Sequence, residues 1–248
     1  MKIAVTGAAG YIGSQLVPYL KSTHEVFASD ILPDKGATAC AVVDVLDSDS
    51  TDSFCAGMDA VVHLASFQKL KTLSQHENSA RMLDTRLKGT YNVLNSAMKA
   101  GVQRVIQVSD LCIFHGYEPD IIVSEDFAPL PDTSPYGQSV YLSELIGREF
   151  ARLSPGLVLT LRLGIVITEG TMSADVVFED SWLSMDDALP AVAGALSIEQ
   201  YDWMGHWGLY NLAADVPGSR YSLGKIKSGQ FDFRPLVSFG TWREGGIS

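Results

Sequence analysis

The sequence lacks the features that mark membrane and secreted proteins. Its 248 residues contain no apolar run of about 18 residues, which is the length that a membrane-spanning helix needs. From Met1 the chain passes within two residues into an apolar, strand-like run, without the longer apolar stretch and small-residue cleavage site of a secretory signal. We therefore expect no membrane segment and a cytoplasmic location.

Cysteine and positive charge are also scarce. Cys40, Cys55 and Cys112 are an odd number without C-x-x-C spacing, so the sequence predicts neither a disulfide framework nor a metal site. Lys and Arg together number 18 against 29 Asp and Glu, a net charge of −11, and they form no basic run. Nucleic-acid binding depends largely on basic side chains that neutralise phosphates, so we expect no nucleic-acid partner.

What the sequence does contain is a regular alternation of strand-like and helix-like segments. Apolar runs rich in β-branched residues lie at 2–6, 25–30, 40–44, 59–65, 104–109 and 157–163. Apolar residues at helical spacing, from Leu83 to Met98, predict a long helix that ends at Gly101. Strands that alternate with helices in this way indicate a parallel sheet covered on both faces. The predicted fold is α/β, a Rossmann-type doubly wound sheet.

The alternation weakens after about residue 165. There remain one amphipathic segment at 186–196 and one strand-like run at 209–213, with no repeat or low-complexity linker. We therefore predict a Rossmann domain over 1–164 and a small C-terminal substrate lobe over 165–248 that packs on it.

The octet T-G-A-A-G-Y-I-G, residues 6–13, predicts a dinucleotide site. Gly7, Gly10 and Gly13 follow a strand and open a helix, where glycines let the backbone approach a pyrophosphate and the helix N-terminus favours its charge. Tyr11 and Ile12 belong to the same predicted contact. The alternative is that these glycines only make a tight turn, but strand, loop and helix in this order favour the cofactor.

Asp30 supports that prediction and indicates which cofactor binds. It ends the second strand, 17 residues after Gly13, where a carboxylate can accept hydrogen bonds from the adenine ribose hydroxyls. The same carboxylate would repel a 2′-phosphate, and the following D-I-L-P-D-K contains no arginine to bind one. The sequence therefore favours NAD over NADP.

Several segments in order resemble landmarks of the extended short-chain dehydrogenase/reductase family, the group of NAD-dependent epimerases and dehydratases. Besides the octet they are V-V-H-L-A-S at 61–66, L-K-G-T-Y-N-V-L at 87–94, A-G-V-Q-R-V-I-Q-V-S at 100–109 and S-P-Y-G-Q-S-V-Y-L-S-E at 134–144. The resemblance covers nearly the whole chain. It implies a sugar-like small-molecule ligand and a homodimer. It also places Asp44 and Val45 at the adenine, and Leu64, Ala65 and Ser66 along the cofactor.

The family's catalytic groups match this chain only in part. The resemblance assigns proton transfer to Tyr136, but the lysine expected four residues later is Val140. Leu111 stands at the serine position and Arg86 at the asparagine position, and no lysine occurs between Lys99 and Lys225. A free tyrosine titrates near ~10 and needs a nearby cation to act as a base at neutral pH. The site therefore departs from the family at three of four positions.

Other residues offer partial substitutes. We hypothesise that Arg86 reaches toward the space beside Tyr136 and lowers its pKa, although an ordinary ion-paired helix arginine is the alternative. His115 as an acid or base and Cys112 as a nucleophile each have a plainer structural interpretation. The aromatic run with Trp203, His206 and Trp207 fits either a ligand pocket or lobe packing.

Two functions of different classes remain open. One is an NAD-dependent oxidoreductase or epimerase acting on a sugar or sugar-acid carbonyl, with Tyr136 transferring the proton. The other is a catalytically inactive NAD-binding sensor or scaffold, which explains the missing groups directly.

Overall fold

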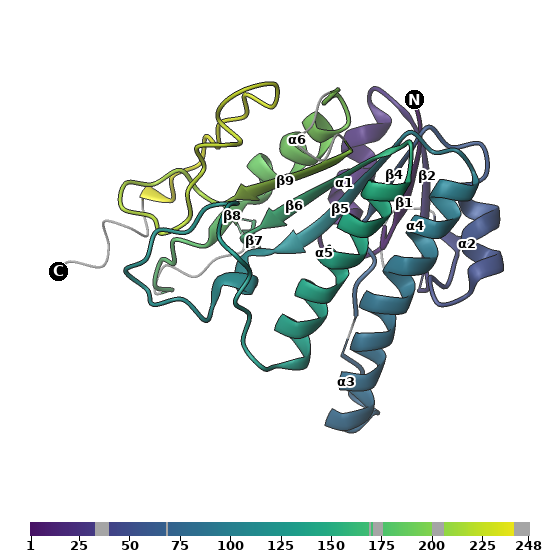
Figure 1. The fold of residues 1–248 in the computed structure, drawn as a ribbon, viewed down its shortest axis with the longest axis horizontal. Coiled ribbons are helices and arrows are strands. Elements are labelled where there is room, and N and C mark those ends of the chain that lie inside the picture. Colours follow the sequence, from purple (N-terminus) through teal and green to yellow (C-terminus); the bar gives the residue numbers. More distant parts are fainter. Residues whose placement is uncertain (33–39, 68, 169, 171–175, 200–205, 241–248) are drawn as a thin grey trace.

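The computed structural model describes residues 1–32, 40–67, 69–168, 170, 176–199 and 206–240. Within them, a seven-stranded sheet runs through the middle of the molecule with helices on both faces (Figure 1). The predicted doubly wound α/β fold is confirmed.

All neighbouring strands of the main sheet are parallel, in the order β3-β2-β1-β4-β5-β6-β9. The strands are β1 (Lys2–Thr6), β2 (Glu25–Asp30), β3 (Ala41–Val42), β4 (Ala60–His63), β5 (Arg104–Asp110), β6 (Leu157–Leu163) and β9 (Trp207–Leu212). Because the strand order reverses between β1 and β4, loops diverge there at the carboxyl edge. That switch point is where doubly wound sheets bind ligands.

Burial on both faces explains the continuous apolar strands. In β1, Ile3 and Val5 pack in a cluster with α1 (Gly13–Lys21) and α6 (Met185–Ala195). Ala4, between them, packs in the cluster of the opposite face. The helices of that face are α2 (Ser48–Cys55), α4 (Thr90–Lys99) and α5 (Pro135–Leu153). Successive side chains point to opposite faces of a strand, so both faces must be apolar.

The predicted helix from Leu83 to Met98 begins earlier in the structure, at Gln75, and is interrupted. The chain forms α3 (Gln75–Leu83), a π-helical turn η2 (Asp84–Gly89) and then α4. A Cβ on Gly89 would lie 2.7 Å from Cγ2 of Val45, so only glycine lets this turn pack so closely against the segment after β3. Wide π turns occur frequently at functional sites, and this one carries Arg86.

The chain beyond residue 164 contributes to two sheets. A two-stranded parallel sheet pairs β7 (Ile165–Ile167) with β8 (Trp182–Ser184), whereas β9 joins the edge of the main sheet. The division at 164/165 stays a prediction. Among the described residues, no helix has the length and apolar content to cross a bilayer.

Candidate cofactor and catalytic site

The glycine turn after β1 is closed to side chains. Gly7 has φ +72°, and a Cβ there would lie 2.6 Å from the backbone nitrogen of Ala65. A Cβ on Gly13 would overlap the carbonyl oxygen of Gly7. A Cβ on Gly10 would meet only that same carbonyl, at 3.1 Å. The loop therefore keeps a bare backbone at the switch point, which suits a pyrophosphate.

We expect Gly7→Ala to abolish NAD binding and to lower the free energy of unfolding by about 3 kcal/mol, because it combines left-handed strain with backbone overlap. Gly57→Ala is the matched control, since Gly57 also has φ +72° but a Cβ there meets nothing within 4 Å. The control should lose only about 1 kcal/mol and keep its NAD affinity. Urea unfolding and fluorescence titration measure both effects, and equal losses in the two variants would contradict the overlap.

Asp30 lies beside the glycine turn, as the sequence suggested. Its Oδ2 accepts a hydrogen bond from the Ala9 backbone nitrogen at 3.0 Å, and its Oδ1 accepts one from Leu32 at 3.0 Å. The carboxylate is thus fixed at the end of β2, next to the loop. The rest of D-I-L-P-D-K, from residue 33, lies outside the described residues.

The residues predicted to contact the adenine, 44–45, and those predicted to lie along the cofactor, 64–66, are also at the carboxyl edge of the sheet. Asp44 Oδ1 accepts a hydrogen bond from Leu46 at 2.9 Å, and the Val45 carbonyl accepts one from Asn92 Nδ2 at 2.9 Å. Leu64 donates its backbone N–H to Thr6 at 3.1 Å, which holds the chain after β4 against the glycine turn.

The remaining residues predicted to contact the cofactor follow the ends of β4 and β1. Ala65 and the exposed Ser66 continue from Leu64 along that edge. From the glycine turn itself, the partly buried Ile12 precedes α1, and the hydroxyl of Tyr11 lies 2.8 Å from Oγ1 of Thr168. The predicted cofactor contacts therefore surround one edge of the sheet, on both sides of the switch point.

His63 is a buried histidine within this framework. Its Nδ1 lies 2.8 Å from the hydroxyl of Thr6 and its Nε2 lies 3.1 Å from that of Thr90. Burial first, and the positive charge of Arg86 second, lower its pKa from 6.5 to about 4. The folded protein therefore holds this imidazole neutral at physiological pH.

We expect this histidine to make folding stability fall as the pH falls. Below about pH 6.5 the unfolded chain protonates His63 whereas the folded chain does not until about pH 4, so stability is lost across that window, by about 3 kcal/mol in total. His63→Gln should remove this component, and His115→Gln, at an exposed histidine, should not. Urea unfolding between pH 7 and pH 4 measures it; parallel profiles for wild type and His63→Gln would contradict the assignment.

Tyr136 contacts a carboxylate and a guanidinium. Its hydroxyl donates to Oδ2 of Asp110 at 2.6 Å, and Cζ of Arg86 lies 4.8 Å from the centre of its ring. Burial, followed by the negative charge of Asp110, raises the pKa of Tyr136 well above its ordinary value, although Arg86 acts in the opposite direction. Arg86 is thus beside Tyr136, as hypothesised from the sequence, but the net shift of the phenol pKa is upward.

Val140 occupies an apolar environment where the family pattern has lysine. It is fully buried, in a cluster with Leu111, Phe114 and Tyr221. Leu111, at the serine position, begins the short helix η3 (Leu111–Phe114) and is itself 1% exposed. Neither side chain has a polar group to offer a substrate.

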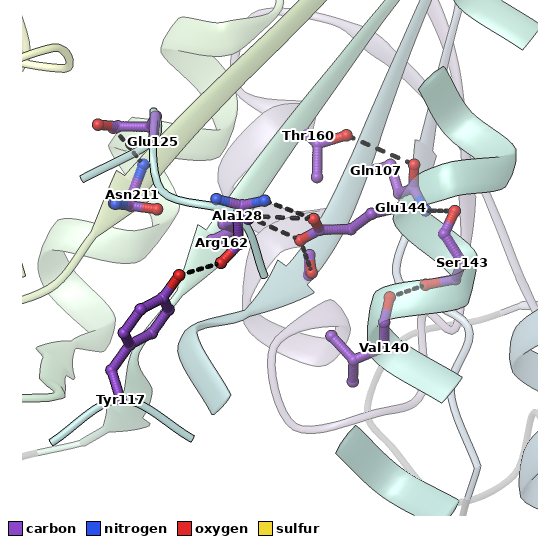
Figure 2. Close-up of polar contacts among 11 residues, drawn as sticks. Gln107, Tyr117, Glu125, Ala128, Val140, Ser143, Glu144, Thr160, Arg162 and Asn211 are labelled. Atoms are coloured by element: carbon purple, nitrogen blue, oxygen red, sulfur yellow. Dashed lines mark hydrogen bonds and ion pairs between the residues drawn. The ribbon is translucent and has the colours of Figure 1, made fainter. Parts of the chain in front are cut away.

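One turn further along α5, a buried ion pair faces the sheet. Glu144 and Arg162 lie 2.7 Å apart between Oε2 and Nη2, with side chains 4% and 2% exposed. Glu144 also accepts a hydrogen bond from Ser109, and Arg162 lies over the Phe114 ring. Figure 2 shows Glu144 pointing from α5 toward Arg162, with Val140 one turn away on the same helix. The ion pair joins α5 to the ends of β5 and β6.

The other candidate residues gain less support from the geometry. Burial, then the charge of Asp110, raises the pKa of Cys112, which keeps it a thiol and removes its nucleophilic form. His115 is exposed and its backbone N–H bonds to Cys112. Trp203 lies outside the described residues, and Trp207 lies in β9. Asp110 is the residue that sequence reasoning missed, although its position at the end of a parallel strand was a signal for it.

A family model described as the NAD dependent epimerase/dehydratase family matches residues 3–176. The chain belongs to this family. It is 29% identical over 208 residues to the L-arabinose 1-dehydrogenase (NAD(P)(+)) of Haloferax volcanii, covering 75% of this chain and 78% of that protein. It is 32% identical over 166 residues to the UDP-glucose 4-epimerase of Bacillus subtilis, covering 60% of this chain but only 48% of that enzyme.

Solved structures of the family share the fold at lower identity. The uronate dehydrogenase of Agrobacterium tumefaciens has a TM-score of 0.80 at 21% identity, covering 98% of this chain and 87% of that one. The glucuronic acid dehydrogenase of Chromohalobacter salexigens has a TM-score of 0.79 at 23% identity, with the same coverage. At this identity the likeness concerns the fold. The family assignment makes NAD the cofactor that fits the bare glycine turn and Asp30.

Proposed function

We propose that this protein is an NAD-dependent oxidoreductase that acts on a hydroxyl or carbonyl group of a free sugar or sugar acid. The observation that carries the proposal is one edge of the sheet. There a glycine turn without room for a Cβ follows β1, the fixed carboxylate of Asp30 ends β2, and Tyr136, on α5, bonds to Asp110 at the end of β5. When bound, NAD supplies the hydride acceptor or donor. Tyr136 would exchange the proton, and Asp30 would favour NAD over NADP.

The substrate class rests on the names of the relatives and on a positive charge beside Tyr136. The relatives named above include an L-arabinose dehydrogenase and two dehydrogenases whose names specify uronate or glucuronic acid. Arg86, stacked on the Tyr136 ring, adds a positive charge that would attract a substrate carboxylate.

Two measurements test the proposal in sequence. Tryptophan fluorescence titration with NAD and with NADP should show tighter binding of NAD. Absorbance of the reduced nicotinamide is then followed with neutral sugars, uronic acids and nucleotide-sugars, and turnover is expected with the first two groups. Tyr136→Phe should remove turnover without weakening NAD binding, whereas the matched variant Tyr141→Phe on the same helix should retain it. Absence of NAD binding would overturn the proposal.

A second candidate is an NAD-binding protein without turnover. The fully buried Val140 at the lysine position and the raised pKa of Tyr136 favour it. It predicts tight NAD binding with no reduction or oxidation of any sugar in the panel. Pairing of two copies stays a prediction.

A further inference from the structure

We propose that Asp110 is the proton acceptor for Tyr136, so that the two residues form a relay in place of the family's tyrosine and lysine. This inference rests on the proposed function. In it, Tyr136 contacts the reacting hydroxyl, and Asp110 acts through Tyr136.

The carboxylate of Asp110 is held in one orientation. Asp110 ends β5 in extended conformation, with φ −140° and ψ 141°, and its Oδ1 accepts the backbone N–H of Cys112 at 2.7 Å. The other oxygen, Oδ2, accepts the hydroxyl of Tyr136 at 2.6 Å. The preceding residue, Ser109, bonds to buried Glu144, which fixes the strand end itself. Asp110 therefore presents a single oxygen to a single phenol.

The phenol of Tyr136 remains open to a ligand on its other side. The residue is 37% exposed, and a hydroxyl that donates one hydrogen bond still has lone pairs that can accept another. Arg86 lies over the ring face rather than at the hydroxyl, so it clamps the ring without occupying the oxygen. A substrate hydroxyl could thus donate to Tyr136 while Tyr136 donates to Asp110.

The electrostatics fit a relay better than a resting phenolate. Burial and the charge of Asp110 raise the pKa of Tyr136, so the phenol is protonated at neutral pH and cannot itself be the resting base. The guanidinium of Arg86 opposes that shift and would stabilise negative charge on the phenol oxygen while protons move. In this arrangement the arginine supports the transfer and the carboxylate receives the proton.

The proton balance follows from oxidation of a secondary alcohol or a lactol. The carbon loses a hydride, which NAD⁺ accepts, and the hydroxyl loses a proton. That proton passes to the Tyr136 oxygen as the Tyr136 proton passes to Oδ2 of Asp110. The C–O bond becomes a carbonyl, Tyr136 ends as a phenol, and Asp110 releases the proton to solvent. Reduction follows the reverse path.

Other ionisable groups near the relay come from four elements. They are Arg86 on η2, Cys112 on η3, Asp132 before α5 and Tyr221 in the C-terminal segment. Burial raises the pKa of Cys112 and of Tyr221, so both stay neutral, and hydrogen bonds from Ser134 lower the pKa of Asp132, so it stays ionised. Cys112, Tyr221 and Asp132 therefore keep one charge state between about pH 6 and pH 9. The exposed His115, whose charge acts on Asp132, is a further ionisable group, so the pH profile is also measured in His115→Gln.

Asp110→Asn tests the relay in the full chain, with Asp126→Asn, in an exposed position of the following loop, as the matched control. The amide keeps an acceptor for Cys112 but cannot take a proton. We expect kcat to fall about 10²- to 10⁴-fold, the usual contribution of a general base, with NAD affinity unchanged. Wild-type activity should be flat between about pH 6 and pH 9, whereas that of Asp110→Asn should rise with pH, because its base is a phenol.

A readout without turnover completes the test. Tyrosine labelled with ¹³C at Cζ reports each phenol's titration by NMR, and Tyr136→Phe assigns the signal. The Tyr136 signal of the wild type should titrate above those of exposed tyrosines, and Asp110→Asn should move it to lower pH. An unmoved titration, or kcat within threefold of wild type, would overturn the relay alone. A wild type that binds NAD but oxidises none of the panel overturns the proposed function together with the relay.

Discussion

Replacing Glu144 with alanine is expected to lower the free energy of unfolding by about 3–5 kcal/mol, because it leaves a buried charge without its partner. The guanidinium of Arg162 is 2% exposed and loses its contacts with both carboxylate oxygens. Ser109, next to Asp110, loses its acceptor as well. Urea unfolding monitored by tryptophan fluorescence measures the loss.

Glu149 provides the matched control on the same helix. It pairs with Arg148 and Arg152, but its side chain is 48% exposed, so Glu149→Ala should leave the free energy of unfolding nearly unchanged. The double variant Glu144→Leu with Arg162→Met should recover much of the loss, because apolar residues of similar volume avoid the desolvation of two charges. A loss for Glu144→Ala as small as that of Glu149→Ala would show that solvent reaches Arg162.

The sheet was predictable because its signals are local. Strands such as β4 and β6 are apolar runs buried on both faces, so the sequence itself marks them, and β1, β2 and β6 were predicted with the bounds that the structure has. The π turn η2 was not predictable in the same way. Gly89, at the end of this turn, packs closely against Val45, which is far away in the chain, and helical periodicity carries no record of such a contact.

The candidate site likewise has one part that local sequence predicts and one part that depends on contacts between distant residues. The cofactor side depends on Gly7, Gly13 and Asp30, whose roles follow from their positions at strand ends. The catalytic side depends on the contact between Asp110 and Tyr136, which are 26 residues apart. The family pattern implies a serine and a lysine, and this chain has Leu111 and Val140 at those positions. Asp110, one residue before the expected serine, matches neither the serine nor the lysine, so its contact with Tyr136 is seen only in the folded structure.

Lysine at position 140, where the sequence resemblance implies one, is expected to destabilise this protein rather than to improve it. Val140 is fully buried against Leu111, Phe114 and Tyr221. An ammonium group ordinarily titrates near ~10.4, and holding it neutral in an apolar cluster at pH 7 costs about 5 kcal/mol. Val140→Met, a long side chain without charge, is the matched control and should cost about 1–3 kcal/mol for overpacking alone.

The pH dependence of Val140→Lys distinguishes a buried neutral amine from a new ion pair. If the folded-state pKa of the lysine is depressed, the unfolded chain binds more protons at neutral pH, so the stability of the variant should rise as the pH approaches 10. The carboxylates nearest along the chain and the fold are already engaged: Asp110 is bonded to Tyr136 and Cys112, and Glu144, one turn further along α5, is paired with Arg162. A lysine variant as stable as Val140→Met, with no such rise, would mean that the ammonium stays charged in the folded protein and has displaced one of these partners.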